Sequence, residues 1–328
     1  MNKIIACIIG FCVVLFSLLI LVKHPQHVEK IQVYPELKPR KPNITNSTPG
    51  YQNYTEIKTQ INKWKSEAPD IVETGTYGTS TKGLDLWYIK VSNLLNKTNK
   101  NKVLITACIH GNEPLATSVT MSFIGYLLSN YMNNEEITHI IDNTDVYFIP
   151  VVSPDSYPHS RHVDGVDPNR NFPGPNNQIK SIKPLYELQK WFLLNKFNAV
   201  ISGHTYGRVY LIPYGDTTTL CPDNEAYLRI IGEMQKTSRY RVQRACEMYN
   251  KPIFGSEVDW YYRNGAISIV CEYGTHQQIP SMQDIKIEFD KTYNGTLIFI
   301  KEAPLIKKSR FFNTKFNNPL HYPFLLKH

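Results

Sequence analysis

The sequence is poor in cysteine, with six among 328 residues, and it contains no Cys-x-x-Cys pair. This absence argues against a zinc site built from cysteines, which normally uses such pairs. Cys108 and Cys271 are therefore expected to be small buried core residues, whereas Cys221 and Cys246 can form one disulfide if the chain is exported. The sequence also has no internal repeat and no helix-turn-helix, zinc-finger or aromatic RNA-binding motif. Nucleic-acid binding is therefore not expected, despite the net charge of +8.

Charged side chains are absent from residues 4–22, an apolar run of about 19 residues. Such a run is long enough to cross the hydrocarbon core of a bilayer as a helix. No small-x-small cleavage site precedes Lys23, so a transmembrane signal anchor over residues 1–23 is favoured over a cleaved signal peptide. Positive charge on both flanks leaves the orientation open. We expect a membrane-anchored protein with its main domain extracytoplasmic.

The rest of the chain divides into three parts. With 42% hydrophobic residues, a chain of 328 residues can bury one sizeable core, and we assign that core to residues 51–304. Residues 24–50 are rich in proline, asparagine and lysine without an apolar period, which is typical of a tether. Residues 305–328 form a basic tail. The tail is expected to be a solvated extension, and contact with anionic lipid or wall polymer is the alternative.

Apolar patterns of helices and of strands alternate along the main domain. We expect helices over residues 54–68, 116–132, 184–195, 224–238 and 284–302, and strands over residues 84–91, 103–108, 145–152, 198–203 and 266–272. This alternation predicts an α/β fold, in which helices cover both faces of one sheet. A functional site is then expected at the ends of the strands.

The motif His-Gly-Asn-Glu, from His110 to Glu113, directly follows the expected strand 103–108. A buried strand that ends in His-x-x-Glu, with a glycine to free the backbone, can aim an imidazole and a carboxylate at one point. That point suits a zinc ion. The pair alone is weak evidence, but His204 offers a third ligand where the strand 198–203 ends. A catalytic zinc takes three protein ligands and keeps one position open.

Two further segments complete a hydrolytic site. Arg161 and the segment from Asp167 to Pro173 are too polar for a core. Paired arginines beside a zinc ion indicate one clamp for a carboxylate and one stabiliser for an oxyanion. Glu272 ends an apolar strand, and a carboxylate that faces a metal there can act as general base on a zinc-activated water.

These motifs stand in the order found in zinc metallocarboxypeptidases of the carboxypeptidase A type, which the chain resembles from about residue 51 to about residue 303. The resemblance implies an α/β fold with a mixed, mainly parallel sheet of the eight-stranded type. It also implies one Zn²⁺ ion per chain. The zinc ligands that it assigns are His110, Glu113 and His204, with Glu272 as the general base and Arg161 as the group that polarises the scissile carbonyl.

The same resemblance implies roles in substrate binding. Asn169 and Arg170 correspond to the pair that grips the terminal carboxylate of the substrate. Asp167 matches the carboxylate that hydrogen-bonds the first histidine from outside and fixes its tautomer. The other residues carried over are Tyr206, Tyr249 as the nearest match to the mobile phenol of the family, and Val258 in the specificity pocket.

The chain departs from the family pattern at several points. The stretch from Glu113 to His204 is short for a digestive-type member, so the loops that line the outer subsites are expected to be trimmed. Asn112 stands where many members carry an arginine. Glu257 is an extra residue beside Val258. If Val258 lines the pocket, apolar or aromatic residues are released; an inward Glu257 favours lysine, arginine or diaminopimelate instead.

The expected function is zinc-dependent hydrolysis of the C-terminal bond of peptides with a free carboxylate. An alternative is a zinc-dependent amidase or acylase that acts on murein peptides or small N-acyl amino acids. The reason is that His-Gly-Asn-Glu and the segment Glu272 to Gly274 also resemble the aspartoacylase and succinylglutamate desuccinylase branch. A second alternative is an inactive binding protein on the same fold. The presence of Glu272 with all three ligands argues against it.

Overall fold

The computed structural model describes residues 38–44, 49–175, 182–276 and 279–307. The described fold belongs to the unit Pro39–His328. The expected membrane helix over residues 1–23 lies outside these ranges, as do most of the tether and most of the basic tail, so all three stay predictions. Within the described ranges, no helix is both long and apolar enough to span a bilayer.

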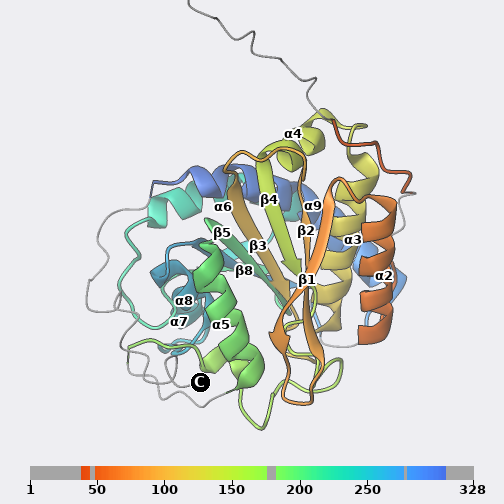
Figure 1. Ribbon diagram of the computed structural model, residues 1–328. Coiled ribbons are helices and arrows are strands. Elements are labelled where there is room, and N and C mark those ends of the chain that lie inside the picture. The colour runs from red at the N-terminus through yellow and green to blue at the C-terminus, as the bar shows by residue number, and fades with distance from the viewer. Residues whose placement is uncertain (1–37, 45–48, 176–181, 277–278, 308–328) are drawn as a thin grey trace, which may run out of the picture. The chain divides into compact units, whose positions relative to one another are not determined.

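An eight-stranded mixed sheet forms the centre of the fold, in the order β1-β2-β4-β3-β5-β8-β6-β7 (Figure 1). Its strands are β1 (Val72–Thr79), β2 (Asp85–Val91), β3 (Asn101–Ala107), β4 (Thr144–Ile149), β5 (Ala199–Thr205), β6 (Val209–Ile212), β7 (Arg241–Arg244) and β8 (Ile267–Tyr273). The pairs β3–β4, β3–β5, β5–β8 and β6–β7 are parallel, and the other three are antiparallel. The expected mixed, mainly parallel α/β sheet is confirmed.

Helices cover both faces of this sheet (Figure 1). They are α2 (Tyr54–Glu67), α3 (Pro114–Asn130), α4 (Glu135–Asn143), α5 (Lys183–Asn195), α6 (Asn224–Ser238), α7 (Ala245–Met248), α8 (Glu257–Arg263) and α9 (Met282–Glu302). Successive side chains of a strand point to opposite faces. Val103 and Ile105 therefore join a core with α2, α3, α4, α6 and α9, whereas Leu104 joins a second core with α5 and α8.

Most elements lie where the sequence predicts them, and their ends follow local signals. The side chain of Asn53 caps α2, Ser281 caps α9, and Pro114 opens α3, where a missing backbone N–H has no cost. Six elements were not expected from the sequence pattern: β1, α4, β6, β7, α7 and α8. Three of these elements have only four residues and carry no measurable period, and β1 contains few apolar residues.

The three adjacent parallel strands β3, β5 and β8 end at the same edge of the sheet, and this edge positions the site. His110 follows β3, and His204 of β5 stands opposite Glu272 of β8 in the register. A functional site was expected at the ends of the strands, and these three residues lie there. Arg161 and the residues from Asp167 to Arg170 come instead from the long connection between β4 and α5.

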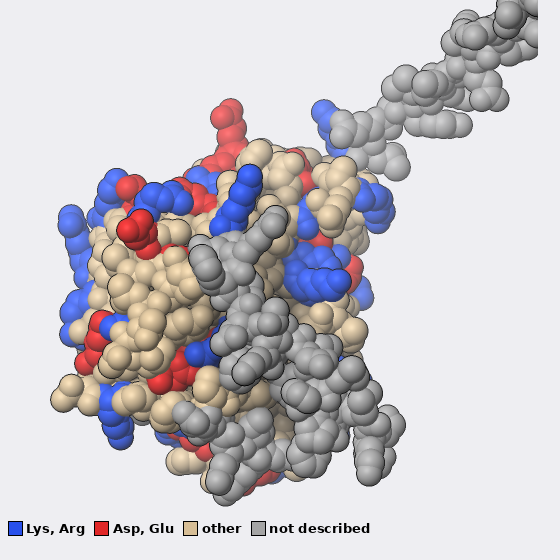
Figure 2. Space-filling view, turned by 90° about the vertical axis from the view of Figure 1, so that its left-hand side faces the viewer, with Lys and Arg blue, Asp and Glu red and all other residues tan. Residues whose placement is uncertain are grey.

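On charge, Figure 2 shows lysine and arginine interspersed with aspartate and glutamate over the described part of one face of the molecule. The excess of positive charge in the sequence is therefore not gathered into a single patch on the part of this face that the figure colours.

The buried helix α3 offers a test of the core. Leu127 is 0% exposed and Leu194, on α5, is 73% exposed. Leu127→Ala should lower the free energy of unfolding by about 2–5 kcal/mol, because lost contacts leave a cavity. The same substitution at Leu194 should change it by less than about 0.5 kcal/mol. Urea denaturation followed by circular dichroism measures both, and equal losses would contradict the burial of α3.

Candidate metal centre and substrate cavity

The loop between β3 and α3 holds two of the expected ligands in place. His110 lies in this loop, and Glu113 is the N-cap residue directly before α3. Between them, Gly111 packs so closely that an added Cβ would lie 2.4 Å from the backbone carbon of Ser156. Backbone freedom was the expected reason for a glycine at this position. The structure gives a different reason, because any larger residue would push the loop, and both ligands with it, away from Ser156.

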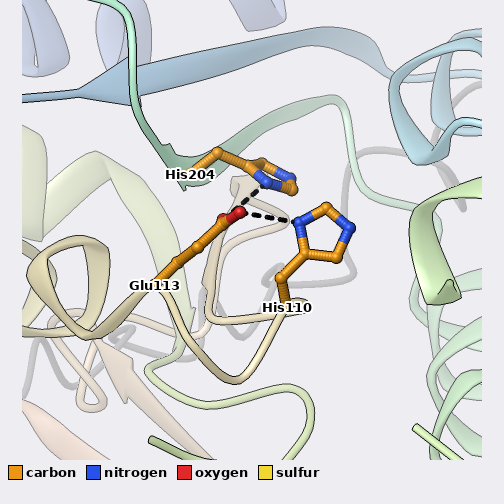
Figure 3. A group of neighbouring side chains, drawn as sticks. All are labelled: His110, Glu113 and His204. Carbon is orange, nitrogen blue, oxygen red and sulfur yellow. Dashed lines mark hydrogen bonds and ion pairs between the residues drawn. The ribbon is translucent and has the colours of Figure 1, made fainter. Parts of the chain in front are cut away.

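The side chains of His110, Glu113 and His204 converge on one point (Figure 3). Glu113 Oε1 lies 2.8 Å from Nδ1 of His110, and Glu113 Oε2 lies 2.9 Å from Nδ1 of His204. One potential ligand atom from each residue lies within 4.8 Å of the others, and all three residues are buried. Two imidazole nitrogens and one carboxylate are the donors of a catalytic zinc with an open position.

Each imidazole also has a carboxylate on the nitrogen that faces away from this point. Nε2 of His110 lies 2.9 Å from Asp167 Oδ1, as the resemblance implied. Nε2 of His204 lies 2.7 Å from Glu257 Oε1, a contact that the sequence analysis did not foresee. Metal-binding histidines usually donate their second N–H to such an acceptor, so the donor set and its surroundings both fit a zinc ion.

These carboxylates shift the pKa values of the buried groups. Burial alone raises the pKa of Glu113, but the charges of His204 and His110 hold it well below its usual range. Burial lowers the pKa of His204, and Glu113 and Glu257 together raise it well above the ordinary histidine value. Glu113 and Glu257 thus favour a proton on the ring of His204, and a metal ion that binds at Nδ1 would compete with that proton.

Arg161 reaches the centre from the connection after β4. Its Nε and Nη2 atoms donate to Asp167 Oδ2 at 3.1 and 2.9 Å, and its Nη1 lies 3.4 Å from His110 Nδ1. Burial raises the pKa of Asp167, but the hydrogen bond from His110 and the charges of Arg161 and Arg170 hold it below its usual range. Asp167 thus joins a guanidinium and a metal ligand into one rigid unit.

Glu272 faces the centre from β8. The residue is partly exposed, whereas its Oε2 atom is buried and forms no hydrogen bond within the part of the chain that the structure describes. Burial and the negative charge of Glu113 raise the pKa of Glu272 to about 7, against the lowering effect of His204. A carboxyl group with a pKa near neutrality is suited to accept and return a proton.

A cavity of about 290 Å³ opens onto the three ligands and Glu272. Its polar wall contains Arg161, Asn169, Arg170, Thr205, Tyr206 and Ser256, and its apolar wall contains Leu211, Ala245, Met248, Ile253, Val258 and Val270. Tyr206 and Tyr249 also line it, and they are 50% and 46% exposed. The structure thus brings every site residue expected from the sequence to this cavity or to its ligands.

Val258 lines the cavity, and Glu257 is absent from the described residues that line it. This placement favours Val258 as the residue that lines the pocket, and the choice of released residue stays a prediction. The rest of the apolar wall was missed, because short elements such as β6 and α7 carry the same residues as an ordinary core.

Two polar residues of the cavity are fixed by their own neighbours. The amide oxygen of Asn169 accepts a hydrogen bond of 2.8 Å from the backbone N–H of Glu257. Arg170 donates from Nη1 to the backbone carbonyl of Asn169 at 2.7 Å, and Arg170 also lines the cavity. Both side chains are thus held ready to meet an anion.

All four cysteines in the described ranges are free and buried. Cys108 and Cys271 are core residues, as expected. Cys221 and Cys246 do not form the disulfide that the sequence allowed. Cys246 Sγ instead contacts the carbonyl oxygen of Thr217 at 3.2 Å, and burial raises the pKa of the Cys221 thiol to about 11.

Known proteins resemble this chain both in sequence and in structure. A zinc carboxypeptidase from Saccharothrix mutabilis subsp. capreolus is 30% identical over 141 residues, which cover 38% of this chain and 32% of the relative. Mast cell carboxypeptidase A from Homo sapiens is 25% identical over 256 residues, which cover 66% of this chain and 60% of the relative. The chain thus spans less than two thirds of the length of both curated relatives.

Solved structures share the fold. The crystal structure of thrombin-activatable fibrinolysis inhibitor superposes with a TM-score of 0.71 at 21% identity, covering 78% of this chain and 75% of that one. The carboxypeptidase A from Helicoverpa armigera gives a TM-score of 0.70 at 18% identity, with coverage of 82% and 78%.

The model of the zinc carboxypeptidase family matches residues 57–295. That range contains the whole converging centre and all eight strands of the sheet. The family binds zinc, and this chain has the His-Glu-His site for it. The chain belongs to the zinc carboxypeptidase family.

Proposed function

We propose that the chain is a zinc-dependent exopeptidase that hydrolyses the C-terminal peptide bond of peptides. The observation that carries this proposal is one cavity that joins four features: three converging ligands, a carboxyl group, two guanidinium groups and an apolar pocket. His110, Glu113 and His204 would hold the zinc. When bound, zinc supplies a Lewis acid that polarises the scissile carbonyl and lowers the pKa of a water molecule.

The substrate would be oriented by both walls of the cavity. Arg170 and Asn169 would bind its terminal carboxylate, because a guanidinium and an amide offer several N–H donors to an anion. Its last side chain would enter the apolar wall that contains Val258. Tyr206 and Tyr249, half-exposed at the cavity, would contact the bound peptide and exclude water.

The proton would then move through Glu272. Its carboxylate would take a proton from a water molecule while the water oxygen bonds to the carbonyl carbon. Arg161 would stabilise the negative charge that develops on the carbonyl oxygen. As the carbon–nitrogen bond breaks, Glu272 would return the proton to the leaving amine, so the carboxylate is regenerated.

The site supports this proposal over the two alternatives. An amidase or acylase for small N-acyl amino acids could use the same centre, but six apolar side chains beside the ligands suit a hydrophobic C-terminal residue better than a small polar acyl group. An inactive binding protein would not need Glu272 beside the ligands. Burying its Oε2 atom without a hydrogen bond to a described residue costs free energy, which a binding role does not explain.

The assignment of the metal ligands can be tested by measuring the zinc content of the purified protein. The purified protein should contain about one zinc per chain, and His204→Ala should lose it, because two ligands hold zinc much more weakly than three. Elemental analysis after gel filtration measures the content. The exposed His162 gives a matched control, so His162→Ala should keep its zinc. Full zinc content in His204→Ala would rule out this centre.

The role of Glu272 can be separated from metal binding. Glu272→Gln should keep the fold and the zinc, yet lose a factor on the order of 10²–10⁴ in kcat, because an amide cannot accept the proton. Steady-state hydrolysis of a peptide, together with zinc analysis, gives both quantities. Tyr249→Phe should lower kcat far less. An unchanged kcat in Glu272→Gln would move the base elsewhere.

The two walls predict a specificity. A peptide that ends in phenylalanine with a free carboxylate should be cleaved well, and its amide should lose roughly 2–5 kcal/mol of transition-state binding, because a guanidinium is left unpaired. The same peptide ending in lysine should be cleaved poorly, since no described residue of the apolar wall can pair with an ammonium. Mass spectrometry of the products compares the three peptides.

Two variants control this specificity test. Arg170→Gln should reduce the difference in cleavage between the peptide with a free carboxylate and its amide. It should leave the preference for C-terminal phenylalanine over lysine unchanged. Val258→Asp should leave the difference between acid and amide unchanged but shift the preference to C-terminal lysine, because it places a carboxylate in the pocket. Efficient release of lysine by the parent would contradict the assignment of the apolar wall.

A further inference from the structure

Glu257 is a buried acidic residue. Neither the resemblance to the family nor the proposed reaction gives it a role. It is the first residue of α8 and its side chain is 0% exposed. Its Oε1 atom lies 2.7 Å from Nε2 of His204, and Oε2 has no hydrogen-bond partner within the described ranges. Of the ion pairs between described residues, the one that involves Glu257 is the pair with His204.

The position of Glu257 excludes a direct role in specificity. It does not belong to the described lining of the cavity, and the oxygen that has a partner points to the outer side of His204. A buried carboxylate is costly unless it is paired. The interaction with His204 therefore offsets the free-energy cost of burying Glu257. This interaction is made at Nε2, the nitrogen of His204 that does not face the proposed zinc.

We propose that Glu257 is a positioning residue of the zinc centre, which fixes the ring orientation and the tautomer of His204. The inference rests on the zinc site of the proposed function. An acceptor at Nε2 keeps a proton on that nitrogen and leaves the lone pair of Nδ1 directed at Glu113 and His110. Asp167 stands in the same relation to His110, so each histidine ligand is backed by a carboxylate.

The backbone of Glu257 extends this role to the substrate side. Its N–H donates to the side-chain oxygen of Asn169, which would bind the terminal carboxylate of the substrate. The amide nitrogen of Asn169 lies 3.4 Å from His204 Nε2. The first residue of α8 thus holds a metal ligand with its side chain and a substrate ligand with its backbone, so the two are fixed relative to each other.

The test measures zinc affinity rather than activity alone. Glu257→Gln keeps the shape of the side chain and removes its charge. It should raise the dissociation constant for Zn²⁺, measured by competition with a chromophoric chelator, by roughly 10–100-fold. Asp167→Asn is the matched variant on the other histidine and should weaken zinc binding by a similar factor. Glu257→Asp keeps the charge, so its dissociation constant for Zn²⁺ should lie between those of Glu257→Gln and the parent.

A purely structural role for Glu257 gives a different pattern. The Tm of each variant, measured with zinc and with a chelator, should then fall equally in both states, while the zinc dissociation constant stays within about twofold of the parent. That result in Glu257→Gln would overturn the inference and leave the proposed function intact. If Glu257→Gln does not fold, a parent-like zinc affinity in Glu257→Asp overturns it, because the shorter acid cannot hold the same contact. Failure of the parent to bind zinc would overturn both proposals.

Discussion

The parallel pairing of β5 with β3 on one side and with β8 on the other is the constraint on which the site depends. In this register His204 stands directly opposite Glu272, and Gly203 opposite Ala107, three residues before His110. Carboxyl ends of parallel strands meet at one edge of a sheet, so His110, His204 and Glu272 converge although they lie far apart in the sequence. The short loop from His110 to Glu113, pressed against Ser156 at Gly111, then adds the third ligand.

The electrostatics of the site follow from how many carboxylates surround two histidines. Glu113, Asp167, Glu257 and Glu272 all lie at the centre, and Arg161 offsets part of their charge. Three of these acids have a histidine within hydrogen-bonding distance, and Glu272 does not. This difference explains why burial and repulsion raise the pKa of Glu272 while attraction lowers that of Glu113. A divalent cation between the ligands would complement this excess of negative charge.

The sequence predicted the ligands better than it predicted the walls around them. His110, Glu113, His204 and Glu272 stand after strands long enough to show a pattern, so their meeting at one edge could be inferred. The apolar wall could not, because β6 and α7 have only four residues each and their side chains, such as Leu211, are indistinguishable in sequence from core residues. Pairing of cysteines likewise depends on distances, and the structure keeps Cys221 and Cys246 free.

The segment from Ser256 to Val258 shows most clearly what a sequence pattern cannot decide. Ser256 is the extended residue before α8, and Glu257 and Val258 are its first two helical positions. Successive residues of a helix point about 100° apart, so Glu257 turns to His204 while Val258 turns into the cavity. A start of α8 one residue earlier or later would exchange an apolar pocket for an acidic one. The proposed pocket residue, Val258, and the proposed support of His204 by Glu257 therefore depend on the same helix start.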